Sequence, residues 1–140
     1  MQESVRPGCG VTDRFPPVDC DGHCLRIRFV TQFRLENARK VIERLGPLCQ
    51  KHAVSQVLLD VRGISGEVTV VDRYELGELF GSALPHGLRV AILATESMVL
   101  PDRFIQTVAN NRGGNILVTT DPGEAAGWLG TPVEYVDPPS

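Results

Sequence analysis

The chain has 140 residues and a formal net charge of −3, with 42% hydrophobic and 22% charged residues. This composition excludes the low-hydrophobicity, high-charge class of disordered chains and predicts a globular protein with a packed core. The acidic balance argues against binding to a phosphate backbone, which usually needs a basic stripe, so we expect no nucleic-acid partner.

No apolar run approaches the roughly 20 residues that span a bilayer. The first residues also lack the apolar segment of a secretory signal, so we expect a cytoplasmic protein without a membrane span. Gly, Pro and charge without periodicity predict an N-terminal tail at 1–16, one domain at 17–136 and a C-terminal tail at 137–140.

The first predicted elements form a hairpin. The Asp21-Gly22 pair is typical of a two-residue type I′ turn, and Pro16 and Pro17 place the first strand at a sheet edge. The second strand, at 24–30, alternates apolar residues with arginines, as a half-buried strand does.

Helices and strands then alternate. Apolar residues at three- and four-residue spacing predict a helix over 35–49, with a kink or break where Gly46-Pro47 interrupts it. The remaining elements are strand 57–61, a helix from 69 or 70 to 84, strand 89–94, helix 101–110, strand 115–119 and a helix that begins after Asp121 and stops at Gly130.

This order predicts an α/β fold. Its sheet is mainly parallel, with one antiparallel strand from the N-terminal hairpin and helices packed on both faces.

The order of elements resembles the SpoIIAA-like branch of the STAS superfamily over about residues 18 to 130. Three stretches carry the resemblance: 58–66 (LLDVRGISG), 72–77 (DRYELG), and 111–114 (NRGG) running on to 120–121 and 126–129 (AGWL). The likeness implies a hairpin followed by βα units, and a regulatory or ligand-binding role.

Relatives in that group carry a phosphorylated serine in an Asp-Ser-Ser-Gly turn between a strand and a helix. The corresponding turn here runs from Asp60 to Glu67 and contains Ser65-Gly66, without an acidic residue directly before the serine. The resemblance thus makes Ser65 the candidate phosphoacceptor.

The thiols near the hairpin are interpreted either as part of a zinc site or as incidental. Cys9, Cys20, His23 and Cys24 match a tetrahedral zinc site in number but not in spacing, so incidental thiols are the preferred interpretation and we expect no bound metal. Cys49 falls on the apolar face of the first helix and is interpreted as a buried hydrophobe.

No catalytic constellation can be assembled. Ser65 lacks the second glycine of a nucleophile elbow, because position 67 is Glu, and neither glycine-rich phosphate-binding motif is present. We therefore predict a non-enzymatic protein without a cofactor.

In open α/β sheets, ligands bind beyond the carboxyl ends of the parallel strands. The predicted strands end in a set of polar residues there, to which Arg112 adds a possible anion contact. We take these residues as a candidate binding rim for a ligand or partner: Asp60, Arg62, Ser65, Thr95, Ser97, Arg112, Thr120 and Asp121.

Two functions remain open. The first is a regulatory module that binds another protein through the rim and the second helix, with a homodimer also conceivable. The second is a carrier or sensor of a small apolar or lipid-like ligand held between helices and sheet. A basic stretch from Arg26 to Arg44 is either a docking surface for an acidic partner or a solvated face, and its interspersed glutamates favour the latter.

Overall fold

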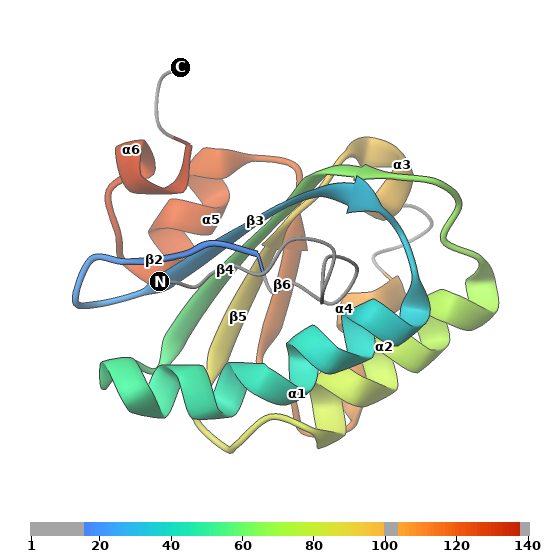
Figure 1. The fold of residues 1–140 in the computed structure, drawn as a ribbon, viewed down its shortest axis with the longest axis horizontal. Coiled ribbons are helices and arrows are strands. Elements are labelled where there is room, and N and C mark those ends of the chain that lie inside the picture. The colour runs from blue at the N-terminus through green and yellow to red at the C-terminus, as the bar shows by residue number, and fades with distance from the viewer. Residues whose placement is uncertain (1–15, 100–103, 138–140) are drawn as a thin grey trace, which may run out of the picture.

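The computed structural model describes residues 16–99 and 104–137, and its centre is a five-stranded sheet (Figure 1). The strand order is β2-β3-β4-β5-β6, with β2 antiparallel to β3 and all other neighbours parallel. The predicted α/β fold with one antiparallel hairpin strand is therefore confirmed. The strands are β2 Val18–Cys20, β3 Leu25–Gln32, β4 Gln56–Ser65, β5 Arg89–Leu93 and β6 Ile116–Thr119.

Helices cover both faces of the sheet, as expected. Because the strand order follows the sequence, right-handed crossovers place α1, α2 and α4 on one face, whereas α5 and α6 follow the last strand and cover the other (Figure 1). The helices are α1 Leu35–His52, α2 Val70–Ser82, α3 Glu96–Val99, α4 Phe104–Asn111, α5 Pro122–Leu129 and α6 Val133–Val136.

Alternate residues of β4 and β5 feed two separate cores. Val57 and Leu59 of β4 join the larger core under α1, α2 and α4, while Leu58 joins the smaller core with Leu129 of α5 and Val136 of α6. The two-residue period of the strand thus decides which helices each side chain meets.

The predicted hairpin is present, but its turn type is wrong. Cys20 pairs with Leu25, so the loop has four residues, and Gly22 is its only residue with a positive φ, 85°. The Asp21 carboxylate accepts hydrogen bonds from the backbone N–H groups of His23 and Cys24, each at 2.8 Å. This side chain closes the loop in place of a type I′ backbone turn.

Helix α1 continues without a break from Leu35 to His52, so the predicted break at Pro47 is wrong. The carbonyl that Pro47 leaves without a donor belongs to Glu43, an exposed residue, and water can reach it. The buried face continues past the proline to Cys49, and this packing keeps the helix intact.

The largest difference from prediction is the length of β4, which runs to Ser65 rather than to residue 61. It gains this length because β3 also extends, to Gln32, and pairs with it in parallel as far as Gln32 opposite Ser65. The register shifts between Arg28 and Val30, which lets the pair continue past the end of β5.

The predicted helix starts hold. Thr69 and Asp72 form a capping box at α2, Asp121 caps α5, and Gly130 ends α5 with φ 74°. Helix α6 was not predicted. The expected helix at 101–110 corresponds to α4, with 101–103 outside the described residues, as are most of the predicted tails.

Two helical glycines test the packing of this fold. In α2, a Cβ on Gly77 would lie 2.6 Å from Val108 Cβ of α4, whereas a Cβ on Gly127 of α5 meets nothing within 4 Å. We expect Gly77→Ala to lower the free energy of unfolding by about 1–3 kcal/mol through overpacking. Gly127→Ala should raise it by up to about 1 kcal/mol through helix propensity. Urea denaturation measures both, and equal effects at the two sites would contradict this account.

Candidate functional site

The described sheet has no topological switch point, the feature that opens a ligand-binding crevice in doubly wound folds. Such a crevice opens where the strand order reverses and neighbouring crossovers leave on opposite faces. Here the order is sequential from β2 to β6. The topology therefore removes the general reason for placing a ligand among the predicted rim residues, and their actual contacts decide their roles.

Asp60 and Arg62 lie together, but in a structural ion-pair network. The Asp60 carboxylate is almost completely buried and accepts hydrogen bonds from the Arg62 guanidinium at 3.0 and 2.9 Å, with Arg28 at 3.5 Å. The same guanidinium donates to Asp137, just after α6, at 2.9 Å. The network ties the end of α6 to the sheet, and Asp137 is therefore more than part of a tail.

The charges in this network stabilise one another. Burial alone would raise the pKa of Asp60, but the hydrogen bonds and charge of Arg62, with the charge of Arg28, outweigh it and hold that pKa below its ordinary value. Hydrogen bonds to Asp60 and Asp137 raise the pKa of Arg62. Asp60 is thus ionised, and both of its carboxylate oxygens already accept hydrogen bonds from Arg62.

The next rim residues have local partners. Thr95 and Ser97 hydrogen-bond each other through their hydroxyls at 3.2 Å, and Asp121 accepts from the Gly123 N–H at 2.9 Å as the cap of α5. Thr120 is exposed beside that cap. These groups are brought to the same edge of the sheet without converging on one point.

Two predicted rim residues lie elsewhere. Ser65 is the last residue of β4, not part of a strand-to-helix turn, and lies about 16 Å along the strand from Asp60. Arg112 follows α4 at the amino end of β6, where it binds Glu78 and the Tyr74 hydroxyl of α2. The prediction that Arg112 belongs to the rim is wrong. The rim lies at the carboxyl ends of the parallel strands, whereas Arg112 precedes the amino end of β6.

Two of the described thiols, Cys24 and Cys49, are buried and poorly suited to metal or nucleophilic chemistry. Burial, with the charge of Asp21, raises the pKa of Cys24 to about 12, and burial raises the pKa of Cys49 to about 11. No group of three or more possible metal-ligating side chains lies within residues 16–99 and 104–137. Cys9 lies outside the described residues.

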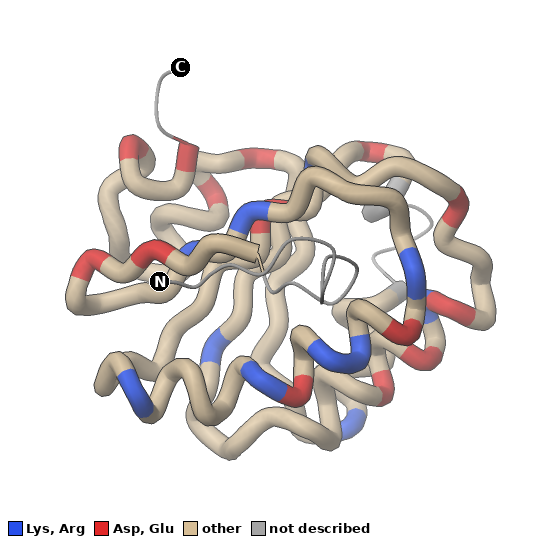
Figure 2. Tube along the Cα trace, viewed as in Figure 1, with Lys and Arg blue, Asp and Glu red and all other residues tan. Residues whose placement is uncertain are grey.

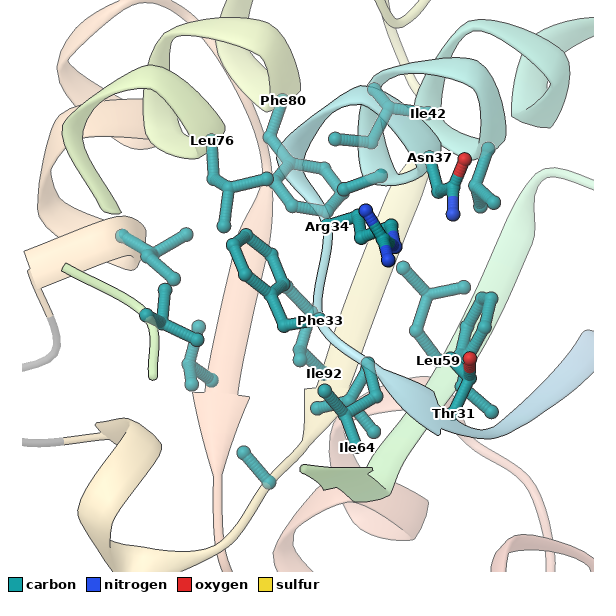
Figure 3. A pocket seen from close by; sticks show the side chains of 18 of the residues that line it. Thr31, Phe33, Arg34, Asn37, Ile42, Leu59, Ile64, Leu76, Phe80 and Ile92 are labelled. Atoms are coloured by element: carbon teal, nitrogen blue, oxygen red, sulfur yellow. The ribbon is translucent and has the colours of Figure 1, made fainter. Parts of the chain in front are cut away.

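An apolar concave feature lies on the other face, between the sheet and helices α1 and α2 (Figure 3). It is a cavity of about 120 Å³. Its lining comes mostly from apolar side chains of β3, β4, β5, α1 and α2: Phe29, Phe33, Ala38, Val41, Ile42, Leu59, Val61, Ile64, Val68, Leu76, Phe80, Ile92, Ala94, Ile105 and Val118.

The cavity reaches the surface where β3 joins α1. The polar residues of its lining are Thr31, Gln32, Arg34 and Asn37, of which the first three are exposed. The view in Figure 3 places Phe33 and Phe80 toward the middle of the cavity, with Arg34 and Asn37 to one side. The site is therefore an apolar pocket with a polar mouth.

A second surface feature lies on α2. Val70 and Val71 are each 66% exposed and Tyr74 is 42% exposed, so three apolar or aromatic side chains face solvent from adjacent turns of one helix. Along α1, in contrast, basic and acidic residues are mixed (Figure 2), and Arg39 pairs with Glu75 of α2 at 3.7 Å. This mixture fits the solvated interpretation of the basic stretch.

Sequence reasoning missed the cavity residues. Phe29 and Phe33 stand in a strand and a connection, where aromatic residues are ordinary core formers, and only the extended β3–β4 pair brings them together around a space. Their presence four residues apart at a strand end was the one available signal.

Comparison with known proteins adds no relative. No family model matches this sequence, and no curated protein is significantly similar to it. The fold and site therefore define a class only, an α/β domain with a mixed sheet and an apolar cavity. Within the described residues, no helix is long and apolar enough to cross a membrane.

The Asp60 network predicts a pH-dependent stability. A carboxylate with a lowered pKa in the folded state stabilises above its unfolded pKa of about 4 and loses this contribution as pH falls through the folded value. We expect Asp60→Asn to lower the free energy of unfolding on the order of 2 kcal/mol at pH 7, and its deficit to shrink between pH 4 and 2.

Chemical denaturation across this pH range measures the deficit. Glu67→Gln, at an exposed carboxylate with no ion pair in the described part of the chain, is the matched control. A deficit of the Asp60 variant that stays constant down to pH 2 would contradict the assignment.

Proposed function

We propose that this domain is a non-enzymatic sensor or carrier that binds a small apolar molecule in the cavity between the sheet and helices α1 and α2. The observation that carries the proposal is the cavity itself, with its almost wholly apolar lining and its opening beside Thr31 and Gln32. Ligand sites in proteins are usually of this kind, apolar with a few polar groups that orient the ligand.

Space of this size is unusual inside a domain core. Protein interiors are normally packed as densely as organic crystals, with few spaces larger than a water molecule, and this cavity of about 120 Å³ is an exception to that packing. Larger apolar side chains in place of Ala38 or Ala94 would fill this space, as in an ordinary hydrophobic core. Ligand binding gives this space a function that a filled core would lack.

The volume also limits the ligand. Pockets for drug-sized molecules start at about 300 Å³, whereas an engineered cavity of about 150 Å³ takes up benzene. The cavity in this chain therefore fits one ring or a short branched chain rather than a lipid tail, which narrows the ligand class expected from the sequence.

Filling the cavity should abolish binding. In the wild-type protein, toluene at ten times its Kd should raise the free energy of unfolding by about 1.4 kcal/mol and shift the methyl resonances of Ile64 and Ile92. Ala38→Leu places three more carbons in the space and should remove both effects without loss of stability. Thermal unfolding and methyl NMR spectra measure them.

The matched control is Ala83→Leu, at an exposed position at the end of α2. It should bind toluene as the wild type does. Undiminished binding by the Ala38 variant would place the probe outside the cavity and contradict the proposal.

A second candidate function is protein binding through α2, as in a STAS-like regulatory module. Its support is the exposed trio of Val70, Val71 and Tyr74, since exposed apolar groups close together mark interaction sites. Membership of the STAS superfamily, phosphorylation of Ser65, homodimer formation and a cytoplasmic location stay predictions.

A charge placed in this surface should weaken an interface there. We expect Val71→Lys to reduce recovery of a cross-linked partner at native expression about tenfold, because an unpaired charge is poorly tolerated in an interface. Thr120→Ala, on the sheet rim, should leave recovery unchanged, and circular dichroism checks the fold of both. Loss of the partner from the rim variant alone would instead place the interface on the rim.

A further inference from the structure

We infer that the cavity ligand is a small monocarboxylate, whose anionic end is bound by Arg34 at the cavity mouth and whose compact apolar end fills the cavity. This inference rests on the proposed function and names the chemical class of its ligand. It follows from three observations on the described residues. The Arg34 guanidinium has no partner among them, Asn37 lies beside it at the cavity mouth, and the described lining contains no acidic residue.

Arg34 differs from the other described arginines in having no partner for its guanidinium. Arg26, Arg28 and Arg39 form ion pairs with carboxylates, Arg62 and Arg112 do the same, and Arg89 stacks on Trp128 and donates to Gln56. Arg44 and Arg73 also have partners. Among the described residues, the Arg34 guanidinium is thus left available while it lines an apolar cavity.

Asn37 supplies a second polar group at the same place. It is the third residue of α1, and Arg34 is the N-cap residue of the same helix, with extended backbone. Both residues line the cavity, and in the view of Figure 3 the guanidinium lies between Phe33 and the Asn37 amide. Within the described part of the chain, this amide makes no hydrogen bond.

These two groups match a carboxylate. A guanidinium presents paired N–H donors that fit the two carboxylate oxygens, and the Asn37 amide can donate to the same anion. A neutral ligand would leave the exposed Arg34 guanidinium to water, and a cationic ligand would be repelled by Arg34. The described lining contains no Asp or Glu that would repel an anion.

The apolar end of the ligand is limited by the space behind this mouth. Leu76, Phe80 and Ile92 close the inner part of the cavity, whose volume of about 120 Å³ is close to that known to hold benzene, about 150 Å³. A single aromatic ring or a short branched chain fits this end. The class is therefore that of arylacetic or short branched-chain carboxylic acids.

Three probes that share an aromatic ring separate charge from shape: phenylacetate, toluene and benzylammonium. Titration of the full chain, followed by the methyl resonances of Ile64 and Ile92, gives a Kd for each probe. We expect phenylacetate to bind about tenfold more tightly than toluene at low salt, and benzylammonium more weakly than both. Added salt should weaken binding of phenylacetate but not of toluene.

Substitutions then test the assigned residue. Arg34→Gln should reduce phenylacetate affinity to the level of toluene while leaving toluene affinity unchanged, and Arg34→Lys should retain part of the preference. Arg44→Gln, at an exposed basic residue of α1 outside the cavity lining, is the matched control and should bind all three probes as the wild type does.

The outcomes distinguish the two levels of the proposal. Equal affinities for phenylacetate and toluene, or a phenylacetate preference that survives Arg34→Gln, would overturn the carboxylate assignment and leave the proposed cavity function standing. Failure of every probe to shift the cavity methyl resonances would overturn the proposed function, and the carboxylate assignment with it.

Discussion

The arrangement of strands and helices that line the cavity depends on the parallel pairing of β3 and β4 beyond the end of β5. β5 ends at Leu93, opposite Asp60, but β4 continues for five residues with β3 as its partner. A register shift between Arg28 and Val30 permits this, and it brings Gly63 so close to β3 that a Cβ there would lie 2.6 Å from the Phe29 carbonyl oxygen. The extended pair therefore requires a residue without a side chain at this point.

This extension also explains the position of the cavity. Phe29, Thr31, Val61 and Ile64 of the lining all come from the part of the two strands near or beyond the end of β5. The helices above are positioned by the ordinary core farther back, around Leu45 and Val57. A sheet that extends past its neighbouring strand thus leaves space beneath the first turns of α1 and beneath Leu76 and Phe80 of α2 that the core does not fill.

The opposite face of the same strands has a different character. Asp60 and Arg62 alternate with Leu59 and Val61, so β4 presents an ion-pair network around the buried Asp60 to α6 and apolar groups to the cavity. Tyr135 of α6 donates a hydrogen bond to the Cys24 carbonyl at 2.9 Å, which adds a second link between this short helix and the sheet. Polar residues that would suit a ligand at the sheet rim instead hold α6 and Asp137 against the sheet.

Much of the fold was predictable because its signals are local. The capping residues Thr69 and Asp121 and the stop at Gly130 act within one turn of the helices they delimit. The length of β4 was not predictable in this way, since Gly63 and Ser65 are poor strand formers that depend on β3 for pairing. The candidate site depends on that same long-range pairing, so it could not be identified from residue spacing.

Helix α2 connects the two proposed functions through its geometry. Leu76 and Phe80 line the cavity from the inner side of α2, whereas Val70, Val71 and Tyr74 face solvent from its first turns. Suppose that α2 can adopt two positions relative to the sheet. A ligand can change the affinity for a partner only if it binds the protein more tightly when the helix is in one of these positions than in the other. Interiors pack in discrete arrangements rather than deforming continuously, so filling the space beside Leu76 and Phe80 would favour the arrangement that accommodates the ligand. Coupling of this kind would make the domain a sensor, and its absence would make it a carrier.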